Sequence, residues 1–282
     1  MNLTVADQRI LIFPEQLSFE DAERKAWSKK GDAFGTITKL VGLLNKPQED
    51  DFELIYKEHR YEPFWHVVAN AHYVYDRNTV YQVPVSGPEV KSVTFLETNF
   101  EVTNTHIHQA ITEHCVQNES EEIIIDGITG KTDKNLKQYM TLSPTLVNDS
   151  LEKEVKKDVI VVPPQVRVSA LMRDSLAKMI KGIQADKILE ETITVENVDL
   201  YYHPVYAFNY LWKSKAKEAI VQVDSLTGEI SVGTRVFKEY MGKLLDKNFL
   251  FDLGADAAGI LIPGGSIAVK LAKKYVDTKE KN

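Results

Sequence analysis

The sequence predicts an α+β fold made of two related units, each a helix or helix pair packed on an antiparallel β-sheet, with C-terminal helices after the second. A repeated pattern is the first observation: Tyr61 and Pro63 recur, with the same spacing, as Tyr202 and Pro204. The second observation is that each copy lies inside the same order of predicted elements, namely a short strand, a helix and a β-rich stretch. Together they predict a duplicated unit.

The first unit begins with a short apolar strand, residues 10–13, which Pro14 closes. Ser18 is a typical N-cap with Asp21 three positions later, so a helix is expected to follow. Helical spacing of apolar residues then continues to about residue 44.

The composition changes in residues 52–102, which are rich in β-branched and aromatic side chains. Turn residues at 76–78 and 86–88 divide this stretch, so the pattern predicts an antiparallel meander. We expect Tyr61 and Tyr202, with their prolines, at a sheet edge, where a missing N–H is tolerated.

The second unit repeats the order of the first. Residues 159–162 form the predicted strand, and Ser169 is the predicted N-cap of the helix that follows. Further strands are expected at 193–200, 205–212 and 219–223.

A polar, charge-rich stretch at residues 141–158 separates the two units. The predicted domains are therefore residues 1–150, with a segment inserted after the meander, and residues 151–282, with a C-terminal tail.

Composition narrows the class of protein. The chain has 282 residues, of which 43% are apolar, enough for one large or two medium cores. Its 34 basic and 41 acidic residues give a net charge of −7, which disfavours nucleic acid as a partner. Cys115 is the single cysteine, so no disulfide forms within the chain. Since the first residues do not resemble a secretion signal, the cytoplasm is the expected location.

A turn motif suggests a family. Residues 221–230 read Val-Gln-Val-Asp-Ser-Leu-Thr-Gly-Glu-Ile, and Asp-x-x-Thr-Gly also occurs at residues 126–130. Asp and Thr side chains can hydrogen-bond the turn backbone, while Gly supplies a positive φ. With the preceding helix and strands, this ending resembles the PepSY-type module, a small α+β domain. The resemblance implies a non-catalytic, regulatory binding role, and the second turn motif suggests that the module occurs in tandem.

Four side chains near the middle of the chain are of the types that bind zinc: His106, His108, His114 and Cys115. On a strand, His106 and His108 would project from one face. Asn104 and the spacing of apolar residues favour a helix instead, in which those two side chains diverge by about 200°. We expect no metal or other cofactor, and a metal-dependent hydrolase using this segment is the alternative function.

Aromatic residues recur in both copies of the pattern. Alternate aromatic side chains on a sheet normally form its core face, which is the expectation here. A curved sheet facing a helix is also a natural ligand cradle, and the residues we would expect to contact a ligand are Tyr202, His203 and Trp212. No motif for a catalytic residue is present.

The C-terminal stretch, residues 249–276, is rich in small and apolar residues. Its uncharged part, residues 257–269, is too short for a membrane span of about 20 residues. We expect helices that pack on the sheets or form a contact between identical chains, and docking on a membrane surface is the alternative. The sequence as a whole predicts a non-enzymatic interaction or regulatory protein with a protein partner.

Overall fold

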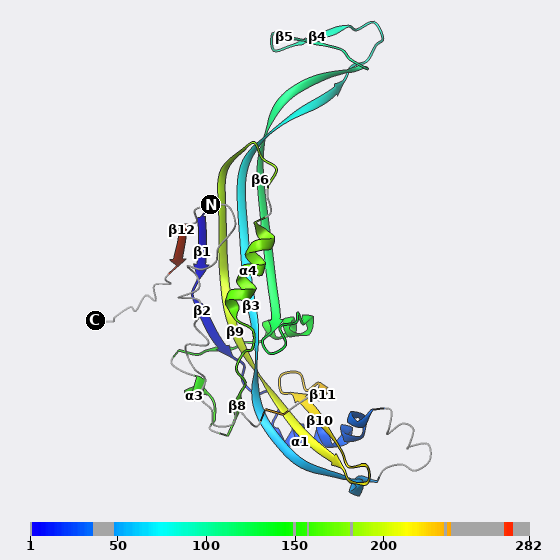
Figure 1. The fold of residues 1–282 in the computed structure, drawn as a ribbon, viewed down its shortest axis with the longest axis vertical. Helices are drawn as coiled ribbons and strands as arrows, with labels where there is room; N and C mark the ends of the chain where they lie inside the picture. The colour runs from blue at the N-terminus through cyan, green and yellow to red at the C-terminus, as the bar shows by residue number, and fades with distance from the viewer. Residues whose placement is uncertain are drawn as a thin grey trace, which may run out of the picture.

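The computed structural model describes residues 2–35, 48–148, 151–156, 158–180, 183–233, 236–237 and 268–272. Most of these residues belong to one long, twisted sheet accompanied by short helices (Figure 1). The prediction of two α+β units, each with its own sheet, is wrong. Ten strands from both halves of the chain form a single mixed sheet, because the long strands of the two halves hydrogen-bond to each other.

Three long strands form the spine of this sheet. β3 (Phe52–Pro84) lies between β9 (Lys187–Trp212) and β6 (His106–Asp126), and it pairs antiparallel with both. The register of β3 with β9 shifts at three places, whereas the register of β3 with β6 is continuous.

Shorter strands complete the sheet along β3 and β9. β10 pairs antiparallel with β9 and β11 with β10, while β1 and β2 run parallel to β9 and β8 runs parallel to β3. β12 pairs with β1, and β7 pairs with β2. A separate hairpin contains β4 and β5. The bounds are β1 Asn2–Ala6, β2 Gln8–Ile12, β4 Ser92–Phe95, β5 Thr98–Glu101, β7 Thr145–Leu146, β8 Ile160–Val161, β10 Lys217–Asp224, β11 Ile230–Gly233 and β12 Ala268–Ala272.

The helices are short. Ser18 caps α1 as predicted, since its hydroxyl accepts a hydrogen bond of 3.1 Å from the backbone N–H of Asp21. In α4 the N-cap is Arg167, so Ser169 lies inside the helix and not at the predicted cap. The α-helices are α1 Phe19–Lys29, α3 Leu151–Glu154 and α4 Val168–Met179, and the 3-10 helices are η1 Lys30–Phe34, η2 Glu49–Asp51, η3 Lys134–Thr141 and η4 Lys213–Lys215.

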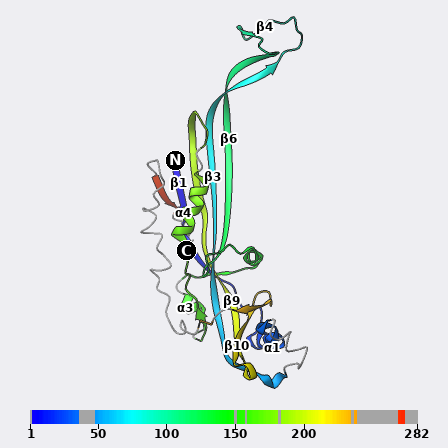
Figure 2. The same ribbon diagram turned by 45° about the vertical axis from the view of Figure 1, so that its right-hand side comes forward.

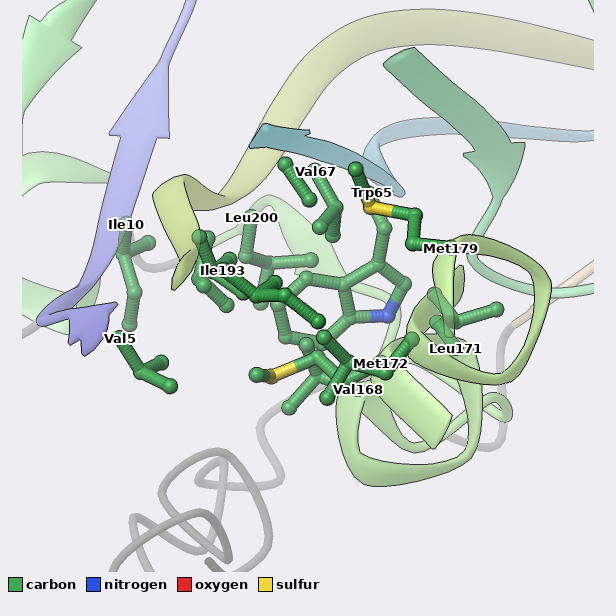
Figure 3. Packing of buried hydrophobic residues seen from close by; sticks show 14 of the residues in the cluster. Val5, Ile10, Trp65, Val67, Val168, Leu171, Met172, Met179, Ile193 and Leu200 are labelled. Carbon is green, nitrogen blue, oxygen red and sulfur yellow. The ribbon is translucent and has the colours of Figure 1, made fainter. Parts of the chain in front are cut away.

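Two apolar clusters pack beneath α4 and α1. Trp65 lies at the centre of the first, against Met172 and its neighbours on α4 (Figure 3), and its Nε1 donates a hydrogen bond of 2.9 Å to the carbonyl of Val166. Tyr202 belongs to this cluster and Tyr206 to the second. Because residues four apart on a strand point to one face, both helices cover the same face of the sheet.

The two Tyr-x-Pro segments lie in the middle of long strands and not at the predicted sheet edge. Tyr61 pairs with Pro204 and Pro63 with Tyr202, so the two copies of the pattern face each other. On its other side β3 changes neighbour near Pro63, from β8 to β6. The carbonyl of Pro63 points to that side and accepts a hydrogen bond from the N–H of Gly127. The N–H of any other residue at this position would point into the gap between β8 and β6, so proline, which has no N–H, leaves no strand hydrogen bond unmade.

Equivalent hydrogen bonds surround the two prolines. Each bond on the β3 side has a counterpart on the β9 side, so the chain has local two-fold symmetry around the two prolines. The bond from Phe13 N to Tyr202 O (2.9 Å) matches that from Val162 N to Tyr61 O (3.0 Å). The bond from Ser225 N to Pro204 O (3.0 Å) matches that from Gly127 N to Pro63 O (2.8 Å). The bond from Tyr206 Oη to Leu17 O (2.7 Å) matches that from Trp65 Nε1 to Val166 O (2.9 Å).

The helix of each half of the chain packs on strands of the other half. The first helix, α1, packs on β9 and β10, which come from the second half, while α4 packs on β3 and β6, which come from the first half. Each hairpin therefore obtains its covering helix from the other half.

The two Asp-x-x-Thr-Gly turns confirm the predicted turn chemistry. Oδ1 of Asp126 accepts from the N–H groups of Ile128 and Thr129, at 3.0 and 2.6 Å. Oδ1 of Asp224 accepts equivalent bonds, and both turns end on a glycine at a φ of about 70°, Gly130 and Gly228.

Two local predictions are wrong. The turn expected at residues 76–78 is absent, since Asp76 and Arg77 continue β3 and pair with β6. The helix expected around His106 to Cys115 is strand β6, because pairing with β3 outweighs the local helical spacing.

The prediction of C-terminal helices is wrong in the one part of the tail that the structure describes. Residues 268–272 form strand β12, which pairs in parallel with β1, where a helix was expected. The other residues of the predicted tail, 249–267 and 273–276, lie outside the described part of the chain, as do residues 36–47 of the predicted first helix pair.

Candidate interaction surface

A long arm is the most distinctive feature of the surface (Figure 1, Figure 2). The pairing of β9 with β3 ends at Asp76, and α4 ends near the same level, where Tyr73 Oη donates to the carbonyl of Met179 at 3.0 Å. Beyond this point residues 77–84 of β3 pair only with residues 106–113 of β6. Within the described residues, the arm is thus a two-stranded ribbon without a third strand.

Polar contacts hold the base of this ribbon. Oε2 of Glu113 accepts a 2.7 Å bond from Nε of Arg77, and its Oε1 accepts a 2.7 Å bond from the hydroxyl of Tyr81. The hydrogen bonds from Tyr81 and Arg77 lower the pKa of Glu113 below its usual value. The side chain therefore stays ionised and fixes the cross-strand contact.

The end of the arm exposes large apolar side chains. β4 and β5 form a tight hairpin there, with Leu96 and Glu97 as its two turn residues. The side chain of Leu96 is 82% exposed and that of Phe95 is 57% exposed. Further down the ribbon Val80 and Tyr81 are also exposed.

The turn at the end of the arm is strained as well as exposed. Leu96 and Glu97 both adopt positive φ, 47° and 64°. Two-residue turns of this kind favour Asn-Gly, because a branched side chain at positive φ collides with the backbone. Neither the strain nor the exposed apolar surface benefits the folded chain, and both features are common at sites where proteins contact another molecule.

Charge at the arm end is mainly negative. The segment that joins β3 to β6, residues 85–105, carries Glu89, Glu97 and Glu101 against the single cation Lys91, and all four side chains are exposed. The exposed apolar pair Phe95 and Leu96 thus stands among carboxylates.

The predicted ligand residues are buried and do not form one site. Tyr202 is 0% exposed and Trp212 is 1% exposed, and both lie on the helix-covered face. His203 points to the opposite face, where its ring packs on Tyr139 at 5.2 Å between centroids. The structure therefore does not bring these three side chains together.

His203 belongs instead to a buried polar group around Asp224. Its Nδ1 lies 3.6 Å from Oδ2 of Asp224, which also accepts a hydrogen bond from Tyr139. Burial raises the pKa of Asp224, but contacts with His203, Tyr139 and the Thr227 backbone lower it by more, to about 2. This carboxylate holds the second Asp-x-x-Thr-Gly turn against η3, which is a structural task.

The predicted metal ligands spread along β6. His106, His108 and His114 lie on one face of the strand and Cys115 on the other, since side chains alternate along a strand. Nδ1 of His114 instead pairs with Asp76, at 2.7 Å. Among the residues with described positions, no three His, Cys, Asp or Glu side chains gather closely enough to hold a metal ion.

Within the described ranges, no helix combines the length and the apolar content needed to cross a membrane. No family model, curated protein or solved structure matches the chain.

The arm was not predicted from the sequence. Its signal is a pair of short β-prone segments, 92–95 and 98–101, on either side of Leu96 and Glu97. Leu-Glu is not a typical hairpin turn, so this signal is weak without the structure.

Proposed function

We propose that this chain is a non-enzymatic interaction protein with a regulatory role, and that it docks the end of its arm into an apolar pocket of a protein partner. The single observation that carries the proposal is Leu96, a large apolar side chain that is 82% exposed on a strained turn at the end of the arm. Apolar anchors of this kind dominate the binding energy of interfaces when a pocket encloses them.

The charge of the arm end indicates the chemistry of the partner. Glu97 follows Leu96 directly, and Glu89 and Glu101 lie in the same segment, so a pocket rimmed by Lys or Arg complements the arm end. The same carboxylates oppose an anionic membrane surface, which favours a protein partner over a lipid one.

Two further observations support a regulatory module. The paired Asp-x-x-Thr-Gly turns, ending at Gly130 and Gly228, carry the resemblance to PepSY-type modules, which implies non-catalytic binding. We place the protein in the cytoplasm, where a chain with Cys115 as its single cysteine needs no disulfide.

The test is a variant that keeps the fold and removes the anchor. Leu96→Asn with Glu97→Gly gives the arm end the preferred Asn-Gly turn, so the hairpin stays intact while the apolar side chain is lost. Leu146→Asn, which removes a leucine that is 45% exposed on β7, is the matched control.

The readout is the amount of each protein that the wild type and the variants capture from an extract of the native host. The expected result is at least one protein that the wild type and the Leu146→Asn variant retain and the arm variant loses, with weaker capture at high salt. Equal recovery of every bound protein by all three chains would overturn the proposal.

A further inference from the structure

The outer edge of β6 is open between His108 and Glu122, whereas the backbone of His106 bonds to Thr103 and the N–H of Asp126 bonds to Lys131. Among the described residues β6 pairs with β3 and with no other strand, and both views show it at the margin of the three-stranded ribbon (Figure 1, Figure 2). Its register with β3 runs without a shift from His106 to Asp126. An open edge presents a row of unpaired N–H and C=O groups to any strand that can align with it.

Most of the usual protections of an edge strand are missing from β6, apart from its acidic side chains. Proteins block such edges with proline, lysine, a bulge or a short strand. β6 is 21 residues long and contains no proline, lysine, arginine or glycine, and no bulge interrupts it. A long, regular edge of this kind is suited to pairing.

The arm itself lacks a strand. Residues 77–84 and 106–113 form a ribbon of two strands, and an isolated two-stranded ribbon is at best marginally stable in water. A strand added at the β6 edge would give this ribbon its third strand and its missing hydrogen bonds.

Charge along β6 indicates which strand that is. Histidines gather at its first end, at His106 and His108, and glutamates at its other end, at Glu119, Glu121 and Glu122. Two copies of β6 placed antiparallel bring the histidine end of one against the glutamate end of the other. The strand is thus complementary to itself in the antiparallel sense.

The glutamates also restrict the register. A two-fold axis at Glu113 would place that carboxylate opposite its own copy, and an axis at Val116 would place Glu113 opposite Glu119. Axes at His114, Cys115 and Asn118 avoid such clashes, and the one at Cys115 lies nearest the middle of β6. It sets His108 opposite Glu122, and residue 107 opposite residue 123, both isoleucine.

We propose that two copies of this chain pair along β6, antiparallel and about a two-fold axis at Cys115, so that the sheet continues across the dimer. Residues 107–113 of each arm then pair with residues 117–123 of the other copy, which supply the third strand. The β6 edge and the Leu96 turn are separate surfaces, so failure of either one leaves the other to be tested.

The first test measures the mass of the full-length chain in solution. Sedimentation equilibrium is expected to give a dimer. His108→Glu sets a carboxylate opposite Glu122 twice in each dimer and is expected to raise the dimer dissociation constant about tenfold. Gln82→Glu is the matched control, because Gln82 pairs with His108 across the arm but lies on β3, away from the edge.

A reciprocal exchange sharpens the result. His108→Glu combined with Glu122→His restores a histidine opposite a glutamate across the edge and is expected to recover most of the lost affinity. If the wild-type chain stays monomeric at about 100 µM, the proposal is overturned. The β6 edge would then be free to pair with a strand of another protein. A dimer that Gln82→Glu weakens as much as His108→Glu also overturns it.

Cys115 reports on the register. A mild oxidant that converts two thiols to a disulfide is expected to give a covalent dimer, since cysteines directly opposite on antiparallel strands lie within disulfide reach. Cys115→Ser is expected to abolish the cross-link and keep the non-covalent dimer. A wild-type dimer that forms no cross-link, while free cysteine in the same tube oxidises, overturns pairing about this residue.

Discussion

Tyr61 lies opposite Pro204 in the antiparallel pairing of β3 with β9, so that the two copies of one sequence pattern meet face to face in the middle of the sheet. The contact joins the two halves of the chain at its centre. Several measurable properties follow from this arrangement.

Separate halves of the chain are expected not to fold. Fragments 1–148 and 151–282 each lack the helix that covers their own hairpin, because α1 packs on β9 and β10 while α4 packs on β3 and β6. Near-ultraviolet circular dichroism should show no fixed tertiary structure for either fragment alone and a native-like spectrum for the equimolar mixture. A cooperative thermal transition in one isolated fragment would contradict this expectation.

Gly127→Ala is expected to destabilise the protein by about 2 kcal/mol. A Cβ at Gly127 would lie 2.7 Å from the carbonyl oxygen of Pro63, a backbone atom that cannot move without breaking the pairing around it. Gly31→Ala is the control, because a Cβ there meets nothing within 4 Å, and its effect should be near zero. Urea unfolding at constant m-value measures both, and equal losses of stability would rule out the steric cause.

Trp65→Ala is expected to cost about 4 kcal/mol of unfolding free energy, because it empties the centre of the cluster beneath α4. Trp65→Phe keeps part of the packing and loses the hydrogen bond to Val166, so its cost should be smaller, about 2 kcal/mol. Val80→Ala, at an exposed position on the arm, should change stability by less than about 0.5 kcal/mol. The order of the three urea midpoints is the check.

Stability should fall between about pH 4 and pH 2 because of Asp224. Its pKa in the folded protein is about 2, below the usual 3.8, so the folded state favours the ionised form. This contribution, about 2 kcal/mol, is fully present above pH 4 and is lost as the pH falls through the folded pKa. Asp224→Asn removes it, so the stability difference between wild type and variant should shrink as the pH approaches 2. A constant difference across that range would show that the carboxylate does not titrate as expected.

Relief of strain at the arm end should be visible in hydrogen exchange. Leu96→Asn with Glu97→Gly is expected to slow exchange of the β4 and β5 amides about fivefold, which corresponds to about 1 kcal/mol. Amides at residues 193–200 of β9, far from the arm, serve as the internal control and should not change. Faster exchange in β4 and β5 would show that Leu96 stabilises the hairpin.

Local patterns predicted the local elements well. The strand before Pro14, the helix after Ser18 and both Asp-x-x-Thr-Gly turns formed where their side chains can satisfy the backbone within a few residues. The helix expected at His106 failed because a neighbouring long strand supplied backbone partners that outweigh helical spacing. The hairpin at the end of the arm was not predicted, because Leu-Glu is an atypical pair of turn residues.

The sequence by itself determined the Ser18 cap, the two Asp-x-x-Thr-Gly turns and the repeated Tyr-x-Pro pattern, since these depend on residues close together along the chain. Only the tertiary structure decided that the copies of the pattern face each other and that each half covers the other's hairpin with its helix. It also decided that β6 ends the sheet with an open edge. The pairing of Tyr61 with Pro204 and the packing of α1 on β10 join groups far apart in the chain, and nothing in the local spacing of residues records which distant strand will complete the sheet.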